Sequence, residues 1–116
     1  MNEELFKART RKLALDIIGL VESLPRSRTA DVIGRQLLRS GTSIGANYRA
    51  ACRGKSKADV ISKLAIVEEE ADETIYWMEL LIESKIVQSS CLNGLVKESN
   101  EIVAMVVASI KTLRGR

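Results

Sequence analysis

The acidic run from Glu68 to Glu73 is the stretch whose residue types and spacing most suggest chemistry. Residues four apart share one face of a helix, so Glu68 lies over Asp72 and Glu69 over Glu73. Stacked carboxylates on a bundle helix are typical of di-metal sites, but those sites also draw ligands from the other helices, including histidines. Because the chain has no histidine, the pattern favours ion pairing, and we expect no metal or other cofactor.

The expected partners of these carboxylates are arginines of the preceding helix. If the chain folds back about Gly54, Arg39 comes level with Glu70. Arg35 then lies level with Glu73 or with the residue after it. Since stacked carboxylates repel one another unless cations lie beside them, we expect a salt-bridge network between the two helices.

The serine and cysteine residues do not indicate nucleophilic catalysis. Such a nucleophile needs a base to take its proton, and the chain has no imidazole. Gly41–Gly45 has the letters Gly-x-Ser-x-Gly, but it lies inside the predicted second helix and not at the strand-to-helix turn that exposes a nucleophilic serine. We interpret Ser40, Ser43 and Cys52 as packing or helix residues, and Gly41–Gly45 as a site of close helix packing rather than a phosphate loop. The sequence therefore predicts that the protein is not an enzyme.

The distribution of charge points instead to binding. The net charge is +3, but residues 26–63 hold nine basic and two acidic side chains, a net of +7. In an antiparallel bundle the start of the first helix, the turn between the second and third, and the end of the fourth meet at one basic end, while the opposite end is expected to be acidic. A phosphate backbone binds such a surface without sequence preference. The residues predicted to contact RNA or DNA are Arg9, Arg11, Lys12, Arg49, Arg53, Lys55, Lys57 and Lys63.

Hydrophobic spacing predicts the elements that carry these residues. Apolar side chains recur every three or four positions in four segments, each bounded by a capping or breaking residue. The segments run from about Glu3 to Leu24, from a cap at Thr29 to the break at Arg53–Lys55, from the capping pattern Ser56–Asp59 to Ser84, and from a cap at Ser89 or Ser90 through Leu113. We predict an all-α fold, an antiparallel up-down-up-down four-helix bundle forming a single domain over residues 1–116. A buried strand is the alternative for Ile102–Ala108, although nothing nearby would pair with it.

The predicted core lines differ between the second and third helices. The second helix presents small and polar residues, and Asn47 either fixes the register of the core or lies exposed. Its line is Ala30, Ile33, Leu37, Ser40, Ile44, Asn47 and Ala51. For the third helix two lines are open, Ile61, Leu64, Glu68, Ala71, Ile75, Met78 and Ile82, or Val60, Leu64, Val67, Ala71, Thr74, Met78 and Leu81.

The apolar surface of the four helices exceeds what one bundle buries, so we predict a homo-oligomer. The residues expected to meet another copy are Tyr76, Trp77, Leu80, Leu81, Val103 and Val107. Such a surface leaves a second functional hypothesis open, a protein-interaction or assembly scaffold that contacts no nucleic acid.

The sequence also bears on the compartment. Cys52 and Cys91 are expected to be free thiols. The charged amino-terminal segment does not resemble a secretion signal. The longest apolar run, Ile102–Ala108, is much shorter than the roughly 20 residues that cross a bilayer. We therefore expect a cytoplasmic protein with no membrane contact.

Three segments carry a resemblance to a known family. They are Leu38–Ala51 (LRSGTSIGANYRAA), Ala58–Thr74 (ADVISKLAIVEEEADET) and Tyr76–Leu81 (YWMELL). These segments closely resemble the bacterial four-helix bundle proteins of the 23S ribosomal RNA intervening-sequence family, and the likeness covers nearly the whole chain. The resemblance implies a small bundle that assembles into a ring, a pentamer, with no activity assigned to most members.

Overall fold

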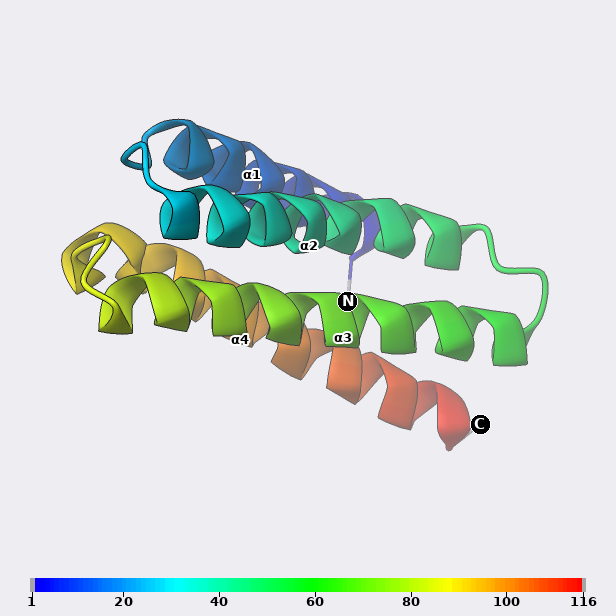
Figure 1. Ribbon diagram of the computed structural model, residues 1–116. Coiled ribbons are helices and arrows are strands. Elements are labelled where there is room, and N and C mark those ends of the chain that lie inside the picture. The colour runs from blue at the N-terminus through cyan, green and yellow to red at the C-terminus, as the bar shows by residue number, and fades with distance from the viewer. Residues whose placement is uncertain (1, 116) are drawn as a thin grey trace.

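Four helices make up the computed structural model, which describes residues 2–115. They are α1 (Glu3–Glu22), α2 (Arg28–Cys52), α3 (Lys57–Glu83) and α4 (Ser89–Arg114). Consecutive helices lie side by side in alternating directions (Figure 1), so the predicted antiparallel four-helix bundle is confirmed. Residues 102–108 lie inside α4, and the strand alternative is therefore wrong.

The first three helices begin at side-chain caps. The side-chain oxygens of Asn2, Ser27 and Ser56 each accept a hydrogen bond from the backbone N–H three residues on, at 3.0–3.1 Å. Each oxygen satisfies a donor that has no partner in the first helical turn. The cap predicted at Thr29 is wrong because Ser27 already holds that role, and α2 begins at Arg28.

The two remaining boundaries also differ from prediction. The first helix ends at Glu22 and not at Leu24, because the chain turns at Ser23 before it reaches Pro25. At the start of α4, Gln88 holds the cap position, and in the described part of the chain its side chain makes no capping hydrogen bond. The predicted serine caps are wrong, since both serines lie within the helix.

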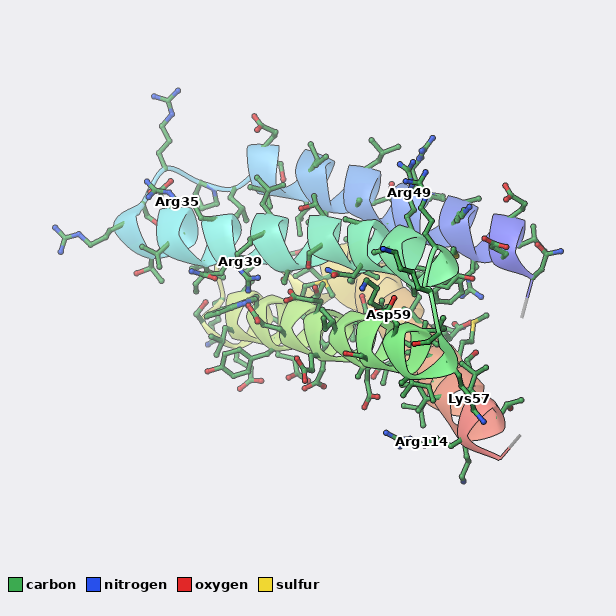
Figure 2. The ribbon with its side chains drawn as sticks, turned by 90° about the vertical axis from the view of Figure 1, so that its right-hand side faces the viewer. Arg35, Arg39, Arg49, Lys57, Asp59 and Arg114 are labelled. Atoms are coloured by element: carbon green, nitrogen blue, oxygen red, sulfur yellow. The ribbon has the colours of Figure 1, made fainter. Side chains whose placement is uncertain are left out.

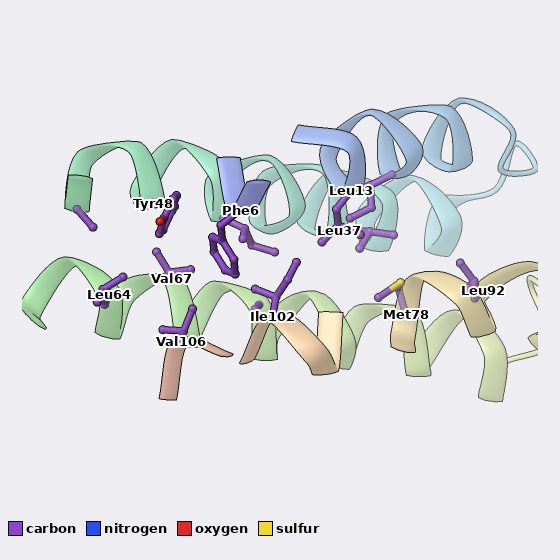
Figure 3. Close-up of a cluster of buried hydrophobic side chains, with 14 of the residues drawn as sticks. Phe6, Leu13, Leu37, Tyr48, Leu64, Val67, Met78, Leu92, Ile102 and Val106 are labelled. Atoms are coloured by element: carbon purple, nitrogen blue, oxygen red, sulfur yellow. The ribbon is translucent and has the colours of Figure 1, made fainter. Parts of the chain in front are cut away.

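The core runs along the axis between all four helices (Figure 3). Its most deeply buried side chains are Phe6, Leu13, Ile17, Leu37, Ile44, Val67, Met78, Leu81, Leu92, Ile102 and Val106. On α3 the second of the two predicted lines faces the core, since Val67 and Thr74 are fully buried. Ile75 of the first line is buried beside them, whereas Glu68 of that line is only half-buried.

On α2 the predicted line is buried at every position except Asn47. Tyr48, and not Asn47, enters the core, where its ring packs against Phe6 with centroids 4.5 Å apart. The amide nitrogen of Asn47 donates to the carbonyl of Ser43 in its own helix at 2.8 Å. Asn47 therefore does not fix the register between helices.

Small residues on α2 bring α1 close. A Cβ atom at Gly41 would lie only 2.5 Å from Cδ1 of Ile17, and one at Gly45 would lie 3.2 Å from Oγ1 of Thr10. These contacts confirm that Gly41–Gly45 serves close helix packing. None of the helices that the structure describes is long and apolar enough to cross a membrane.

Candidate functional surfaces

Part of the acidic run is neutralised by α2, as predicted. Nη1 of Arg39 lies 3.3 Å from Oε2 of Glu70, and Nη2 of Arg39 forms an ion pair with Glu73. The indole N–H of Trp77 also donates to Glu73 at 2.9 Å. The hydrogen bond from Trp77, together with Arg39, holds the pKa of Glu73 below its ordinary value. Glu73 is therefore an ionised side chain that links α3 to α2 through Arg39.

The predicted role of Arg35 is wrong. Its guanidinium pairs with Asp31 in its own helix, with Nη2 2.6 Å from Oδ2. Figure 2 shows Arg35 reaching away from α3. Among the described residues, Arg39 therefore provides the ion pairs between α2 and the acidic run of α3. Within residues 2–115, no three acidic or cysteine side chains converge in a group that could hold a metal ion.

Four other carboxylates form an exposed acidic stripe along α3. Because they are spaced three or four residues apart, they share one side of the helix. The stripe, which we call the α3 face, consists of Glu69, Asp72, Tyr76, Glu79 and Glu83. None of its four carboxylates forms an ion pair with another described residue. The whole of α3 holds eight acidic and two basic side chains, a net of −6.

Three of the residues predicted to contact nucleic acid already pair with carboxylates. Arg9 makes a two-pronged contact with α4, with Nε and Nη2 donating to the Glu98 carboxylate at 2.9 and 2.6 Å. This hydrogen bonding lowers the pKa of Glu98. Lys12 and Lys63 each pair at 2.9 Å with an aspartate four residues away. The Lys12–Asp16 pair is the more exposed of the two, with side chains 77% and 43% exposed. Because exposed ion pairs are weak, a phosphate can displace Asp16 from Lys12 more readily than Glu98 from Arg9.

The other predicted basic residues are exposed. Arg11, Arg49, Arg53 and Lys55 form no ion pair with any residue in the range 2–115. Arg53 and Lys55 lie at the turn between α2 and α3, and Lys57 is the first residue of α3. Figure 2 shows Arg49, Lys57 and Arg114 toward the same end of the molecule. That arrangement agrees with the basic end expected from the sequence.

The opposite end carries charges of both signs. Arg26, Arg28 and Arg35 lie there together around one hollow, with Asp31 among them. Glu22 and Glu83, the last residues of α1 and α3, also lie at this end. The net charge differs more sharply between two neighbouring helices. The second helix holds four arginines and one aspartate, a net of +3, beside the strongly acidic α3.

Arg11 and Arg49 lie on either side of a groove between α1 and α2. The groove has a volume of about 850 Å³, and its lining includes Ala8, Leu15 and Ala46. Lys7 and Lys12 also line it, and their charges are matched by Glu3, Glu4 and Asp16. This α1–α2 groove is therefore lined by small and apolar residues together with charged ones, and the positive charges of its two arginines are unmatched among the described residues.

The residues predicted to meet another copy divide into exposed and buried ones. The side chains of Tyr76 and Val107 are 52% and 42% exposed, whereas Leu80 and Val103 are half-buried. Leu81 is fully buried in the core of its own subunit. Leu81 therefore does not belong to this surface, because the α3 line through Val67 and Thr74 turns it inward. Trp77 is half-buried and donates to Glu73.

Sequence reasoning missed a second set of exposed apolar side chains, on α1. Leu5, Leu15 and Ile18 are 65%, 61% and 39% exposed. Ile18 directly follows the core residue Ile17, and Leu15 lies midway between the core residues Leu13 and Ile17, so both were hidden among apolar positions. A helical projection with Leu13 and Ile17 facing the core would have placed Leu15 outside.

Cys52 lines a pocket of about 660 Å³ at the basic end, between α1, α2, α3 and α4. Burial, and then a hydrogen bond with Glu3, raises the pKa of the Cys52 thiol. The thiol therefore stays protonated near neutral pH, which does not suit a nucleophile.

Comparison with known proteins gives a consistent result. Residues 5–108 match the family model described as 23S rRNA-intervening sequence protein. A similar solved structure is a protein of unknown function from the S23 ribosomal protein family of Bacteroides thetaiotaomicron, which is 38% identical with a TM-score of 0.88. The match covers 96% of this chain and 99% of that one. None of the curated proteins matches the chain significantly.

Proposed function

The chain belongs to the 23S rRNA-intervening sequence protein family, and from that premise we propose that it is a self-assembling, non-enzymatic protein that binds the phosphate backbone of RNA or DNA. The observation that carries the proposal is the exposed basic turn between α2 and α3. There Arg53 and Lys55 have no ion-pair partner among the described residues, and Lys57 follows two residues after Lys55. Each cation that neutralises a phosphate releases counterions, which drives binding without sequence preference.

The aromatic residues support backbone binding over base recognition. Proteins that read single strands stack bases on exposed aromatic rings. Phe6 and Tyr48, the aromatic residues of this half of the molecule, are 1% and 5% exposed and pack against each other in the core. No described aromatic ring at the basic end is thus free to stack on a base.

Self-assembly would multiply this weak surface. The basic turn offers only a few positive charges in one subunit, and its affinity at physiological salt would be low. In a ring of five, the copy number implied by the family resemblance, five such turns would lie on one rim. A single nucleic-acid strand that binds several of them gains affinity from each.

The proposal is tested by fluorescence anisotropy with mixed-sequence RNA and DNA over a range of salt concentrations. The triple variant Arg53→Gln, Lys55→Gln, Lys57→Gln should weaken binding to all sequences alike. It should also reduce the slope of log affinity against log salt by about one for each phosphate that the variant no longer neutralises.

A matched control removes the same charge from the opposite end. The variant Arg26→Gln, Arg28→Gln, Arg35→Gln should leave the salt slope unchanged if the basic turn binds the phosphates. Equal losses of affinity in both triple variants would show that net charge alone is responsible. No binding by the native protein at low salt would refute nucleic-acid binding and favour the assembly scaffold, to which the exposed apolar residues on α1 and α3 already point.

A further inference from the structure

The α3 face and the α1–α2 groove have complementary shape and charge. We propose that copies of this chain pack head-to-tail, with Tyr76 of one copy inserted into the α1–α2 groove of the next. Asp72 and Glu79 on either side of it then pair with Arg11 and Arg49. This inference rests on the self-assembly proposed above, and it names the partner of the surface around Tyr76.

The α3 face presents an aromatic knob between carboxylates. Tyr76 is 52% exposed, and its ring packs edge-on against Trp77 with centroids 5.1 Å apart. Trp77 is held in turn by its hydrogen bond to Glu73. Asp72 and Glu79 lie one turn before and after Tyr76 on the same side of α3. An exposed, positioned aromatic residue loses little side-chain freedom when it binds, which suits an anchor residue.

The groove presents the opposite arrangement. Ala8 and Ala46 line it with side chains too small to fill it, and Leu15, 61% exposed, adds an apolar wall. Arg11 and Arg49 flank these residues and have no ion-pair partner in the described structure. An aromatic ring would bury apolar surface there, and each arginine would gain a carboxylate.

The position of the two surfaces in the subunit decides the type of assembly. Helix α3 packs against α2 and α4, while α1 packs against α2 and α4, so α1 and α3 lie diagonally across the bundle. Each copy can therefore use its α3 face for one neighbour and its groove for another. A contact between different surfaces of identical chains is heterologous and closes into a ring if the rotation between copies allows it.

A symmetric contact through either surface alone is disfavoured by charge. Two α3 faces brought together would oppose eight carboxylates with no cation between them. Two grooves brought together would oppose Arg11 and Arg49 with their own copies. Only the mixed contact pairs the unmatched charges of both surfaces.

The inference also separates the self-association surface from the nucleic-acid surface. In the assembly, Arg11 and Arg49 are occupied by carboxylates of the neighbouring copy. Arg53, Lys55 and Lys57 lie beyond the groove and do not line it. The basic turn thus stays open to a phosphate backbone while the groove is filled.

Two variants that each spoil one surface test this inference by size-exclusion chromatography with light scattering at micromolar concentration. Ala46→Glu fills the groove and adds a carboxylate against the α3 face. Tyr76→Arg removes the knob and adds a cation against the groove. Each variant should fall to the mass of a single chain, whereas an equal mixture should associate again, because each keeps the surface that the other lacks.

Val32→Glu is the matched control, since Val32 is 54% exposed on α2 but does not line the groove. It should keep the native mass, and circular dichroism melts should show that all three variants stay folded. A native protein that is itself monomeric would refute the self-assembly proposal and this inference together. If the native protein assembles but either surface variant keeps the native mass, the mixture stays monomeric, or the control also dissociates, only the head-to-tail contact is refuted.

Discussion

Helices α2 and α3 lie side by side along the bundle (Figure 1), yet they differ in the size of their packing residues and in the sign of their exposed charges. The second helix packs through small residues such as Gly41 and Ser40 and shows arginines to the outside. The third packs through larger residues such as Val67 and Met78 and shows carboxylates. Arg39 pairs the two sets of charges at one point. The charges left over on each helix are the ones available to a partner.

The difference in core residues means that α3 should be weakened most by loss of volume. Met78 is fully buried, and Met78→Ala should cost about 2–5 kcal/mol in the free energy of unfolding, because it leaves a cavity that neighbours fill only in part. Urea denaturation followed by circular dichroism measures this cost. A loss below about 1 kcal/mol would mean that α3 does not depend on large side chains.

On α2, where small residues pack closely against α1, added side-chain volume should destabilise the fold. Gly41→Ala places a methyl group against Ile17, where a Cβ would lie 2.5 Å from Cδ1. We expect a net loss of about 1–2 kcal/mol, because the steric cost exceeds the gain in helix propensity. Gly19→Ala is the control, since nothing lies within 4 Å of its Cβ position, and it should stabilise the fold by about 0.5–1 kcal/mol. Similar effects of both changes would contradict the close-packing role of Gly41.

The charge link between the two helices should contribute least. Arg39 and Glu73 are partly exposed, at 49% and 33% of their side chains, so Arg39→Gln should cost only about 0.5–1 kcal/mol. The pKa of Glu73 is lowered in the folded state, so its stabilising contribution is present above its ordinary value of 4.5 and is lost as the pH falls through the lower folded value. The stability difference between native protein and variant should therefore shrink in acid. Urea denaturation at pH 7 and at pH 3 tests this, and a difference that grows in acid would contradict the pairing.

Most of the architecture could be predicted from the sequence, because helix periodicity and capping are local. Four helices, their antiparallel order and the pairing of Arg39 with Glu70 all follow from spacing. The errors in the fold fall at helix ends and at one core position of α2: Ser27 and not Thr29 caps the helix, and Tyr48 and not Asn47 enters the core. Local packing can move a helix cap or a core position by one or two residues, and hydrophobic periodicity alone does not resolve such a shift.

The surfaces were predicted less well, because their residues depend on contacts between distant parts of the chain. Arg9 and Arg11 look alike in the sequence, yet Arg9 meets Glu98, 89 residues away, and Arg11 meets no carboxylate among the described residues. Leu81, which was predicted to meet another copy, is buried, while Leu15, for which nothing was predicted, is exposed. The sequence by itself determined the helices, their order and the family. Only the tertiary structure decided which charges are neutralised and which apolar residues face outward, since both depend on the rotation of each helix against its neighbours.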